Sequence, residues 1–501
     1  MPSRFRGRYG PAVAIALLGL SPNIVLTTAF SPLTESLMKD LGASKVGLQL
    51  AEGLSNAGYA VGAVIAAYLG QRLLQRRLFL WYEAAFVVGS VIAAAAPGLG
   101  LFLAGRVLQG TATGFMLVAA LPPLVTRFGA DRLRVTVAVV NVGLFGATTL
   151  GPVIGGPIAA AGAWRALFWV VAALGAAGLA MAALGYPVID PPDPGLRLDR
   201  TAIWLAVAAT FLPFFATSAL GGSSFGSPVF LGPFLLGLAA LAALIVVEYR
   251  KREPLMPVKA LSSQLPVTGT AVAMIAGAVF VTAVELAQLF LAKVAGVPPT
   301  SAGTMFWPMP IGLLVAAVLF GVLLPTRWLA VLVNAGLVTL GVGTALLLVV
   351  ADRGSSSASF GWAVLLLGFG AGASVSPGLF LAAFGVPSQS LGRAFALVEL
   401  LRSEAGYAVA PVVAAVAQGS ATLAGGVRTG LVVTLVLTGL GLVIALVLPA
   451  VSGARLRAPD LAGWLAGEGK ALPSPATATH LRPSVDDEEA EPLLPWRASR
   501  Q

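Results

Sequence analysis

The chain has 501 residues, of which 57% are hydrophobic and 10% are charged, and its formal net charge is +10. Soluble domains carry about a quarter charged residues, so this composition excludes an ordinary soluble fold and indicates a membrane protein. The sequence has no cysteine and a single histidine, His480, which excludes disulfides and metal sites built from thiolates or several histidines. Arginines in cytoplasmic loops account for the basic charge, so no nucleic-acid partner is expected. No cofactor is expected either.

Transmembrane helices are predicted from the apolar windows of the chain, because a helix needs about 20 apolar residues to cross a bilayer. Windows between charged or Pro/Gly-marked breaks predict fourteen spans, at 11–30, 46–69, 78–97, 99–126, 134–160, 165–186, 201–220, 227–249, 265–291, 301–324, 328–350, 358–386, 392–418 and 428–450. Lysines and arginines gather in alternate connecting segments, beginning with Arg4, Arg6 and Arg8 at the N-terminus. Basic residues favour the cytoplasmic side, so both termini are predicted to lie inside.

Two longer polar loops, 187–200 and 249–264, divide the predicted spans into six, two and six. The predicted organisation is an all-α integral membrane protein with a cytoplasmic N-terminus at 1–10 and an N-terminal six-helix bundle at 11–186. A linker with two inserted transmembrane helices follows at 187–264, then a C-terminal six-helix bundle at 265–450. The polar, Pro- and Ser-containing segment 451–501 predicts a disordered cytoplasmic tail.

Motifs in consecutive spans resemble a known family. RVLQG contains Arg106, Gln109 and Gly110, and GATTLGPVIGG covers 146–156; WRALFWV (164–170), EPLMP after the eighth span and VELLRSEAGYAV (398–409) accompany them. Over residues 11–450 the chain resembles the major facilitator superfamily, in particular its fourteen-helix drug:proton antiporter branch. The resemblance implies the major facilitator fold and proton-driven efflux of small amphipathic molecules by alternating access. It also implies a monomer in the inner cell membrane and no enzymatic activity.

The chain departs from the family pattern in the loop between spans 2 and 3. This loop keeps the basic residues Arg72, Arg76 and Arg77 and is predicted to be a gating loop, but Arg72 stands where the family has an aspartate. Ser21 stands about where this branch often carries an acidic residue in the membrane. Part of the usual gate and one usual proton site are therefore replaced.

Charged residues inside the spans are the candidates for proton coupling. A charge at the bilayer centre costs at least about 2.5–3.5 kcal/mol, so it must face protein or water. The predicted proton-coupling residues are, in order, Glu285, Glu404, Glu399 and Glu52, with Arg106 added by resemblance. Two alternatives stay open: Arg106 caps carbonyls as a packing residue, and Glu399 forms a static i,i+3 ion pair with Arg402. Glu83, near the inner end of its span, is expected at the membrane interface.

Two further groups of residues are predicted to shape the transport path. Those predicted to bind substrate are Gln109, Asn56, Gln288, Phe306, Trp307 and Arg402. Gly146, Gly151, Pro152, Gly155 and Gly156 are predicted to be structural, because glycines permit close helix packing and prolines bend a helix. Close packing common to any membrane protein is the alternative interpretation of the glycines.

Four functional hypotheses remain open on the sequence. Export is favoured by the resemblance, while an importer or a lipid translocator of the same fold is the main alternative. A membrane-embedded enzyme needs clustered His, Asp or Lys near one interface, which the sequence lacks. A sensor or scaffold would bind its ligand without transporting it.

Overall fold

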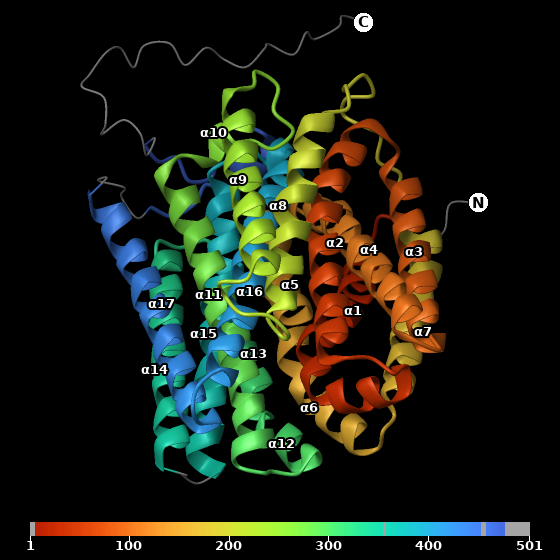
Figure 1. Ribbon diagram of the computed structural model, residues 1–501. Helices are drawn as coiled ribbons and strands as arrows, with labels where there is room; N and C mark the ends of the chain where they lie inside the picture. The colour runs from red at the N-terminus through yellow and green to blue at the C-terminus, as the bar shows by residue number, and fades with distance from the viewer. Residues whose placement is uncertain (1–5, 354–356, 452–456, 476–501) are drawn as a thin grey trace, which may run out of the picture.

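The computed structural model describes residues 6–353, 357–451 and 457–475, and none of these residues lies in a β-strand (Figure 1). Thirteen helices of the described chain are long and apolar enough to cross a membrane. A further helix, α2, has 28 residues and lies alongside them, but it carries more polar residues. The predicted all-α membrane fold with fourteen spanning helices is confirmed.

The N-terminal half contains six spans. They are α1 (Tyr9–Leu41), α2 (Lys45–Arg72), α3 (Gln75–Ala95), α4 (Leu99–Thr126), a fifth span divided into α5 (Gly129–Val140), η1 (Asn141–Phe145) and α6 (Gly146–Ala160), and α7 (Trp164–Gly185). The η1 segment is a π-helix, a distortion that often marks functional sites. It lies directly before the helix that carries Pro152 and Pro157, so the fifth span is irregular in its middle.

The C-terminal half repeats this plan with its own irregular spans. It contains α11 (Gln264–Leu289) with the π-helix η2 (Phe290–Val294), a span divided into α12 (Pro299–Met305) and α13 (Pro308–Leu323), α14 (Leu329–Arg353), α15 (Ser357–Phe384), the short η3 (Ser388–Ser390), α16 (Leu391–Gln418) and α17 (Leu423–Val451). The two halves lie side by side in the ribbon, the first in red to yellow and the second in green to blue (Figure 1).

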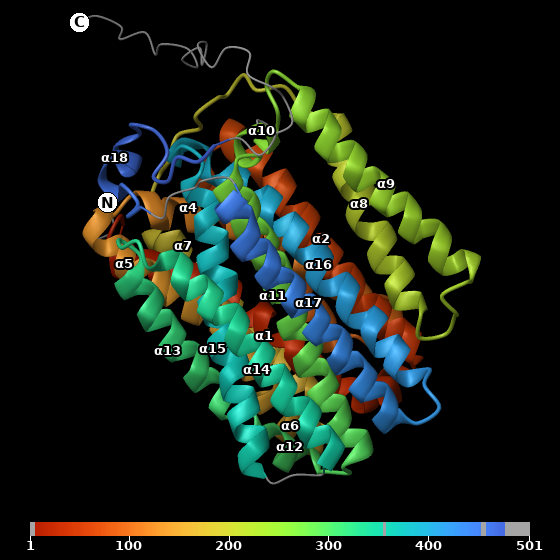
Figure 2. The ribbon, with the colours of Figure 1, turned by 90° about the vertical axis from the view of Figure 1, so that its left-hand side faces the viewer.

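Two inserted helices, α8 (Arg200–Ala219) and α9 (Pro228–Arg250), form a hairpin beside α2 and α16, followed by the short α10 (Val258–Leu261) (Figure 2). Its two ends are tied together by Lys251, which donates hydrogen bonds to Asp199 and to Glu248. Burial disfavours the charged form of Asp199, but hydrogen bonds from Lys251 and from the Ala202 N–H outweigh burial and lower its pKa. Burial likewise opposes the charge of Lys251, but its two carboxylate partners raise its pKa.

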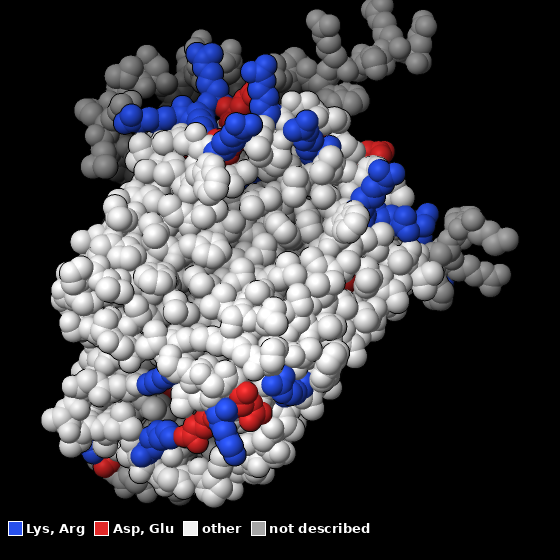
Figure 3. Space-filling view, turned by 45° about the vertical axis from the view of Figure 1, so that its right-hand side comes forward, with Lys and Arg blue, Asp and Glu red and all other residues white. Residues whose placement is uncertain are grey.

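The two ends of the bundle differ in what they carry. We call the end with the α1–α2 turn and α12 the outer end, and the end with α10 the inner end (Figure 1). Lysines and arginines appear at both ends of the molecule, whereas the wide band between them is almost free of charge (Figure 3). Such a band matches the hydrocarbon core of a bilayer, and under the predicted orientation the inner end faces the cytoplasm.

Part of the predicted tail is folded, which corrects the expectation that 451–501 is disordered throughout. Residues 457–475 include α18 (Leu461–Ala466) and lie against the inner end (Figure 2). The Trp464 Nε1–H donates to the Val386 carbonyl at 2.8 Å, and the ring packs edge-on against Phe384. Because α18 also contacts α5, this segment touches both halves. The acidic run 486–491 lies outside the described residues.

Candidate transport cavity

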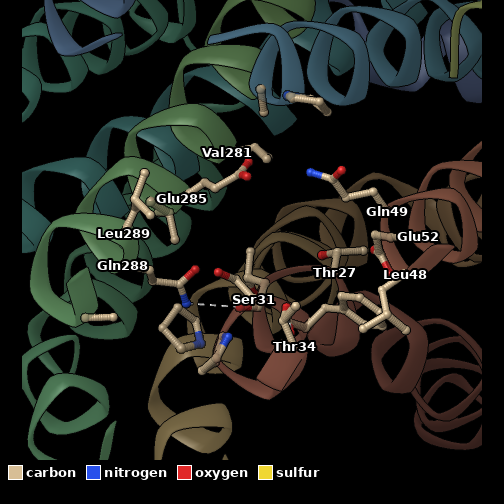
Figure 4. Close-up of a pocket in the computed structure, with 18 of the residues that line it drawn as sticks. Thr27, Ser31, Thr34, Leu48, Gln49, Glu52, Val281, Glu285, Gln288 and Leu289 are labelled. Carbon is tan, nitrogen blue, oxygen red and sulfur yellow. Dashed lines mark hydrogen bonds between the residues drawn. The ribbon is translucent and has the colours of Figure 1, made fainter. Parts of the chain in front are cut away.

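A cavity of about 610 Å³ lies between the two halves near the outer end. Its walls come from α1, α2 and α6 of the first half, from α11, α12 and α16 of the second, and from the inserted α8. Of the predicted substrate-binding residues, Asn56, Gln288 and Phe306 line it. Gln288 donates to the Thr28 carbonyl at 3.1 Å and thereby links α11 to α1 across the cavity (Figure 4).

Glu285 of α11 lines this cavity together with Gln49 and Glu52 on the facing helix (Figure 4). Its side chain is partly exposed, and it forms no ion pair or hydrogen bond with the described residues. An unpaired carboxylate in a mostly apolar wall gains from taking up a proton or a cationic group. Glu285 is therefore the candidate proton site that lines the cavity without an ion pair or hydrogen bond to another described residue.

Glu52 differs from Glu285 because a cation already neutralises it. Arg106 is fully buried, and its Nη2 donates to the Glu52 carboxylate at 2.7 Å. The other guanidinium nitrogen, Nη1, donates to Asn23 at 3.2 Å and to Gln109 at 2.9 Å. Gln109 continues the chain with a 2.8 Å hydrogen bond to Ser90. Gln109 thus belongs to a buried polar network of the first half. The sequence predicted it to contact substrate, but it does not line this cavity.

Glu399 and Arg402 form the i,i+3 pair that the sequence left as an alternative, at 2.5 Å. Glu399 also accepts a 3.1 Å hydrogen bond from Tyr59 of α2, so the pair is connected to the first half. The Arg402 guanidinium lies 5.7 Å from the ring of Phe145, which belongs to η1. Neither member of the pair lines the cavity, and the contact between Arg402 and substrate stays a prediction.

Three other predicted positions lie away from the cavity. Trp307 is 54% exposed at the break between α12 and α13 and does not line this cavity, so its contact with substrate stays a prediction. Glu404 is buried, and its Oε1 has no hydrogen-bond partner among the described residues. Glu83 is 0% exposed, which corrects its expected interfacial position, because glycines of α1 and α7, Gly19 and Gly178, make room for its carboxyl group.

The glycines of the fifth span allow backbone contacts on two sides. A Cβ on Gly151 would lie 2.0 Å from the Thr28 hydroxyl of α1, and a Cβ on Gly155 would lie 2.7 Å from Pro32. A Cβ on Gly156 would lie 2.3 Å from the Pro299 carbonyl oxygen of α12. Gly151 and Gly155 thus permit packing within the first half, while Gly156 permits close contact between the halves.

Gly146 and Pro152 complete this group. A Cβ on Gly146 would lie 3.2 Å from Leu313 of α13. Pro152 lies inside α6 and lines the cavity, while its carbonyl oxygen is near Gly303 of α12. Both positions therefore lie where the fifth span meets the second half.

The molecule is closed between the cavity and the inner end. Ala63, Ala67 and Val118 of the first half pack against Ala396 of α16. The Asn141 side chain of η1 donates to the Gly372 carbonyl of α15 at 2.8 Å. The described structure therefore has its substrate-sized cavity on the outer side of this closure.

The predicted gating loop makes contacts within the first half. Arg72 donates to the Tyr68 hydroxyl at 2.8 Å, and Arg76 donates to the Ala183 carbonyl of α7 at 2.7 Å. Arg77 is exposed. These arginines fix the loop to α2 and α7, and none of the hydrogen bonds found for them reaches the second half.

Sequence reasoning missed the residues that link the two halves at the cavity mouth. Lys293 of η2 pairs with Glu35 of α1, and Lys45 of α2 donates to Gln418 of α16. It also missed Tyr59 at the closure, although a tyrosine in an otherwise small and apolar stretch of α2 was an available signal. Pairs that join distant helices cannot be found from spacing along one helix.

Two helical halves around a shared cavity, within an uncharged belt, define a membrane transporter of the two-bundle type. A sequence profile of the Major Facilitator Superfamily matches residues 16–411, and the chain belongs to this superfamily. The chain is 28% identical to the uncharacterized MFS-type transporter YubD of Bacillus subtilis over 77% of its own length and 76% of the relative's. It is 27% identical to the drug efflux pump JefA of Mycobacterium tuberculosis, over 74% of its own length and 73% of the relative's.

The fold has counterparts among solved structures. The crystal structure of the human organic anion transporter MFSD10 superposes with a TM-score of 0.61 at 16% sequence identity. The match covers 88% of this chain and 100% of that one. At this identity the likeness describes the fold alone.

Proposed function

We propose that the protein is a proton-coupled exporter of small amphipathic molecules such as drugs or natural products. It acts by alternating access, as a monomer, in the inner membrane of the cell. The efflux activity named for one relative supports export, as do the motifs shared with the fourteen-helix drug:proton antiporter branch. The cavity wall supports an amphipathic substrate, because it combines apolar side chains with amides, hydroxyls and charged groups.

The observation that carries the proposal is the unpaired carboxyl group of Glu285 in the cavity. The other acidic residues of the wall have partners, since Glu52 is bound by Arg106 and Glu35 by Lys293. A proton or the cationic group of a substrate can neutralise Glu285, but one carboxylate does not need both. Mutual exclusion at this group would make proton binding and substrate release a single exchange, which is antiport.

The return step requires the closure at the inner end to open. In our proposal the halves rock about the cavity, so that Tyr59 separates from Glu399 and Asn141 separates from Gly372. The π-helix η1, Asn141–Phe145, supplies the flexible point, because it interrupts the regular α-helical hydrogen bonding of the fifth span. The Gly156 contact with α12 supplies the surface on which the two halves turn.

The test uses ethidium, an amphipathic fluorescent cation, in vesicles whose lumen receives the outer end of the protein. An acidic lumen is expected to drive ethidium into the vesicles, because protons leave as ethidium enters. Glu285→Gln is expected to abolish this gradient-driven uptake, whereas Glu253→Gln, in an exposed loop at the inner end, serves as a matched control.

Unchanged uptake in the Glu285→Gln variant would remove this residue from the mechanism. Uptake driven by an alkaline lumen would identify symport and therefore an importer. Uptake that ignores both gradients would exclude proton coupling altogether.

A further inference from the structure

The inserted hairpin α8–α9 contacts both halves of the transporter at the outer end. Ser218 of α8 donates to the Gln49 carbonyl of α2 at 3.1 Å. A Cβ on Gly53 of α2 would lie 2.4 Å from the Ser218 hydroxyl, so this contact is as close as the backbones allow. On the other side, Phe230 of α9 packs in one cluster with Ala415 of α16. The hairpin therefore covers the seam where α2 and α16 meet.

A second cavity of about 370 Å³ lies beneath this hairpin. Leu220 and Phe225, from the end of α8 and the turn after it, form one apolar wall, and Ala415 lies on the α16 side. Ser224 contributes a polar group at the same turn. No charged side chain lines this cavity among the described residues, so the site suits an uncharged, aromatic or aliphatic group.

The second cavity adjoins the main one. Gln49, Thr217, Pro411 and Gln418 line both, so these four residues form the partition between them. The hydrogen bond from Lys45 to Gln418 lies at the same place and joins α2 to α16. A side-chain hydrogen bond is a small barrier compared with a packed helix contact, so the partition can open without a change in the fold.

The partition also holds an unsatisfied polar group. The side-chain oxygen of Gln49 is buried and has no hydrogen-bond partner in the described part of the chain. A buried acceptor without a donor destabilises the fold unless a ligand or water supplies the donor. This acceptor is thus placed to bind a polar group of a molecule that extends from one cavity into the other.

We propose that α8 and α9 build an accessory binding chamber for the uncharged end of the amphipathic substrate as it leaves the main cavity. The inference rests on the proposed export function. It assigns to the inserted helices a direct part in substrate binding, with Gln49 as hydrogen-bond acceptor at the passage and with Leu220, Phe225 and Ala415 as the apolar surface.

The natural absence of cysteine allows a direct test by thiol labelling of single-cysteine variants. Ala415→Cys reports on the chamber, Ala292→Cys reports on the main cavity, and Ala421→Cys, in the exposed outer turn outside both, is the control. With ethidium at about ten times its Kd, labelling of both Ala415→Cys and Ala292→Cys is expected to slow about tenfold. Labelling of Ala421→Cys is expected to stay unchanged.

Two outcomes would overturn the chamber and are distinguishable. Protection at Ala292→Cys without protection at Ala415→Cys would refute the chamber while leaving the main cavity as a binding site. Protection at neither position would refute both the chamber and ethidium binding by the main cavity.

A transport assay provides the second measurement: Ala415→Trp fills the chamber and is expected to lose most ethidium efflux, whereas Leu235→Trp on the exposed face of α9 is expected to retain it. Full efflux by Ala415→Trp would also refute the proposal.

Discussion

Removing the negative charge of Glu52 is expected to destabilise the first half strongly, because Arg106 would lose its counter-ion. Arg106 is 0% exposed, and the distance between its Nη2 and the Glu52 carboxylate is 2.7 Å. Breaking a buried pair by removing one partner costs about 3–5 kcal/mol. Glu52 is 19% exposed to the cavity, and Arg106 keeps its bonds to Asn23 and Gln109, so we expect about 3 kcal/mol for Glu52→Gln.

The assay is equilibrium unfolding in mixed micelles, followed for Glu52→Gln, Arg106→Gln and the double variant. The double variant removes both charges, so it is expected to be more stable than Glu52→Gln alone. Arg106→Gln is expected to cost less than Glu52→Gln, because the carboxylate that remains can reach water in the cavity. Strictly additive losses in the double variant would refute the reasoning, since independent effects mean that the two charges do not depend on each other.

Four further outcomes are expected. Gly156→Val should block transport while the protein still folds and inserts, measured as ethidium efflux against surface expression, because a Cβ there meets the Pro299 carbonyl of the other half. Glu83→Gln should leave thermal stability nearly unchanged and Glu83→Lys should prevent folding, since the carboxyl group is buried without a hydrogen-bond partner among the described residues and an added cation would be buried without a counter-ion there. Trp464→Ala should cost about 3–5 kcal/mol in unfolding experiments and increase thiol labelling of a single cysteine introduced at the inner closure, Ala67→Cys. The stability difference between wild type and Asp199→Asn should be constant from about pH 5 to 9 and shrink progressively as the pH falls below about 4 and through the lowered pKa of Asp199, measured as thermal unfolding at each pH, because a lowered carboxyl pKa stabilises the fold only while the group is ionised.

Much of the fold follows from the sequence because bilayer thickness sets the length of each apolar window. The sixfold, twofold and sixfold grouping of the spans and the ion pair of Glu399 with Arg402 both follow from distances along the chain. Contacts between helices do not. Glu52 showed no opposite charge within one turn of its own helix, yet Arg106 of another helix pairs with it. Glu83 lies near the end of its span, but the rotation of α3 directs it into the bundle.

The folded segment around α18 could not be predicted for a related reason. Its composition is polar and rich in proline and glycine, which is typical of a disordered tail. The segment is nevertheless held in place by specific contacts, including the hydrogen bond from the Gln264 N–H to the Pro475 carbonyl. Such contacts depend on a surface formed by the helices of the bundle. The sequence pattern of the tail alone does not indicate that surface.

The distribution of the ion pairs favours the proposed change of state. The two strong, buried pairs, Arg106 with Glu52 and Arg402 with Glu399, each lie within one half. Between the halves the described contacts are weaker. Lys293 and Glu35 form an exposed pair at the cavity mouth, and such pairs contribute at most about 1 kcal/mol.

The other polar links that the described residues make across the interface are single hydrogen bonds, such as those from Asn141 to Gly372 and from Tyr59 to Glu399. Each contributes about 1 kcal/mol, or somewhat more where the acceptor is charged. In the proposed mechanism each half moves as a rigid body that keeps its own charges neutralised, and each of the polar links described between the halves is individually weak. In the proposed mechanism, a proton or cation at Glu285 shifts the equilibrium between the two states by about 1.4 kcal/mol for each tenfold difference in its affinity for them.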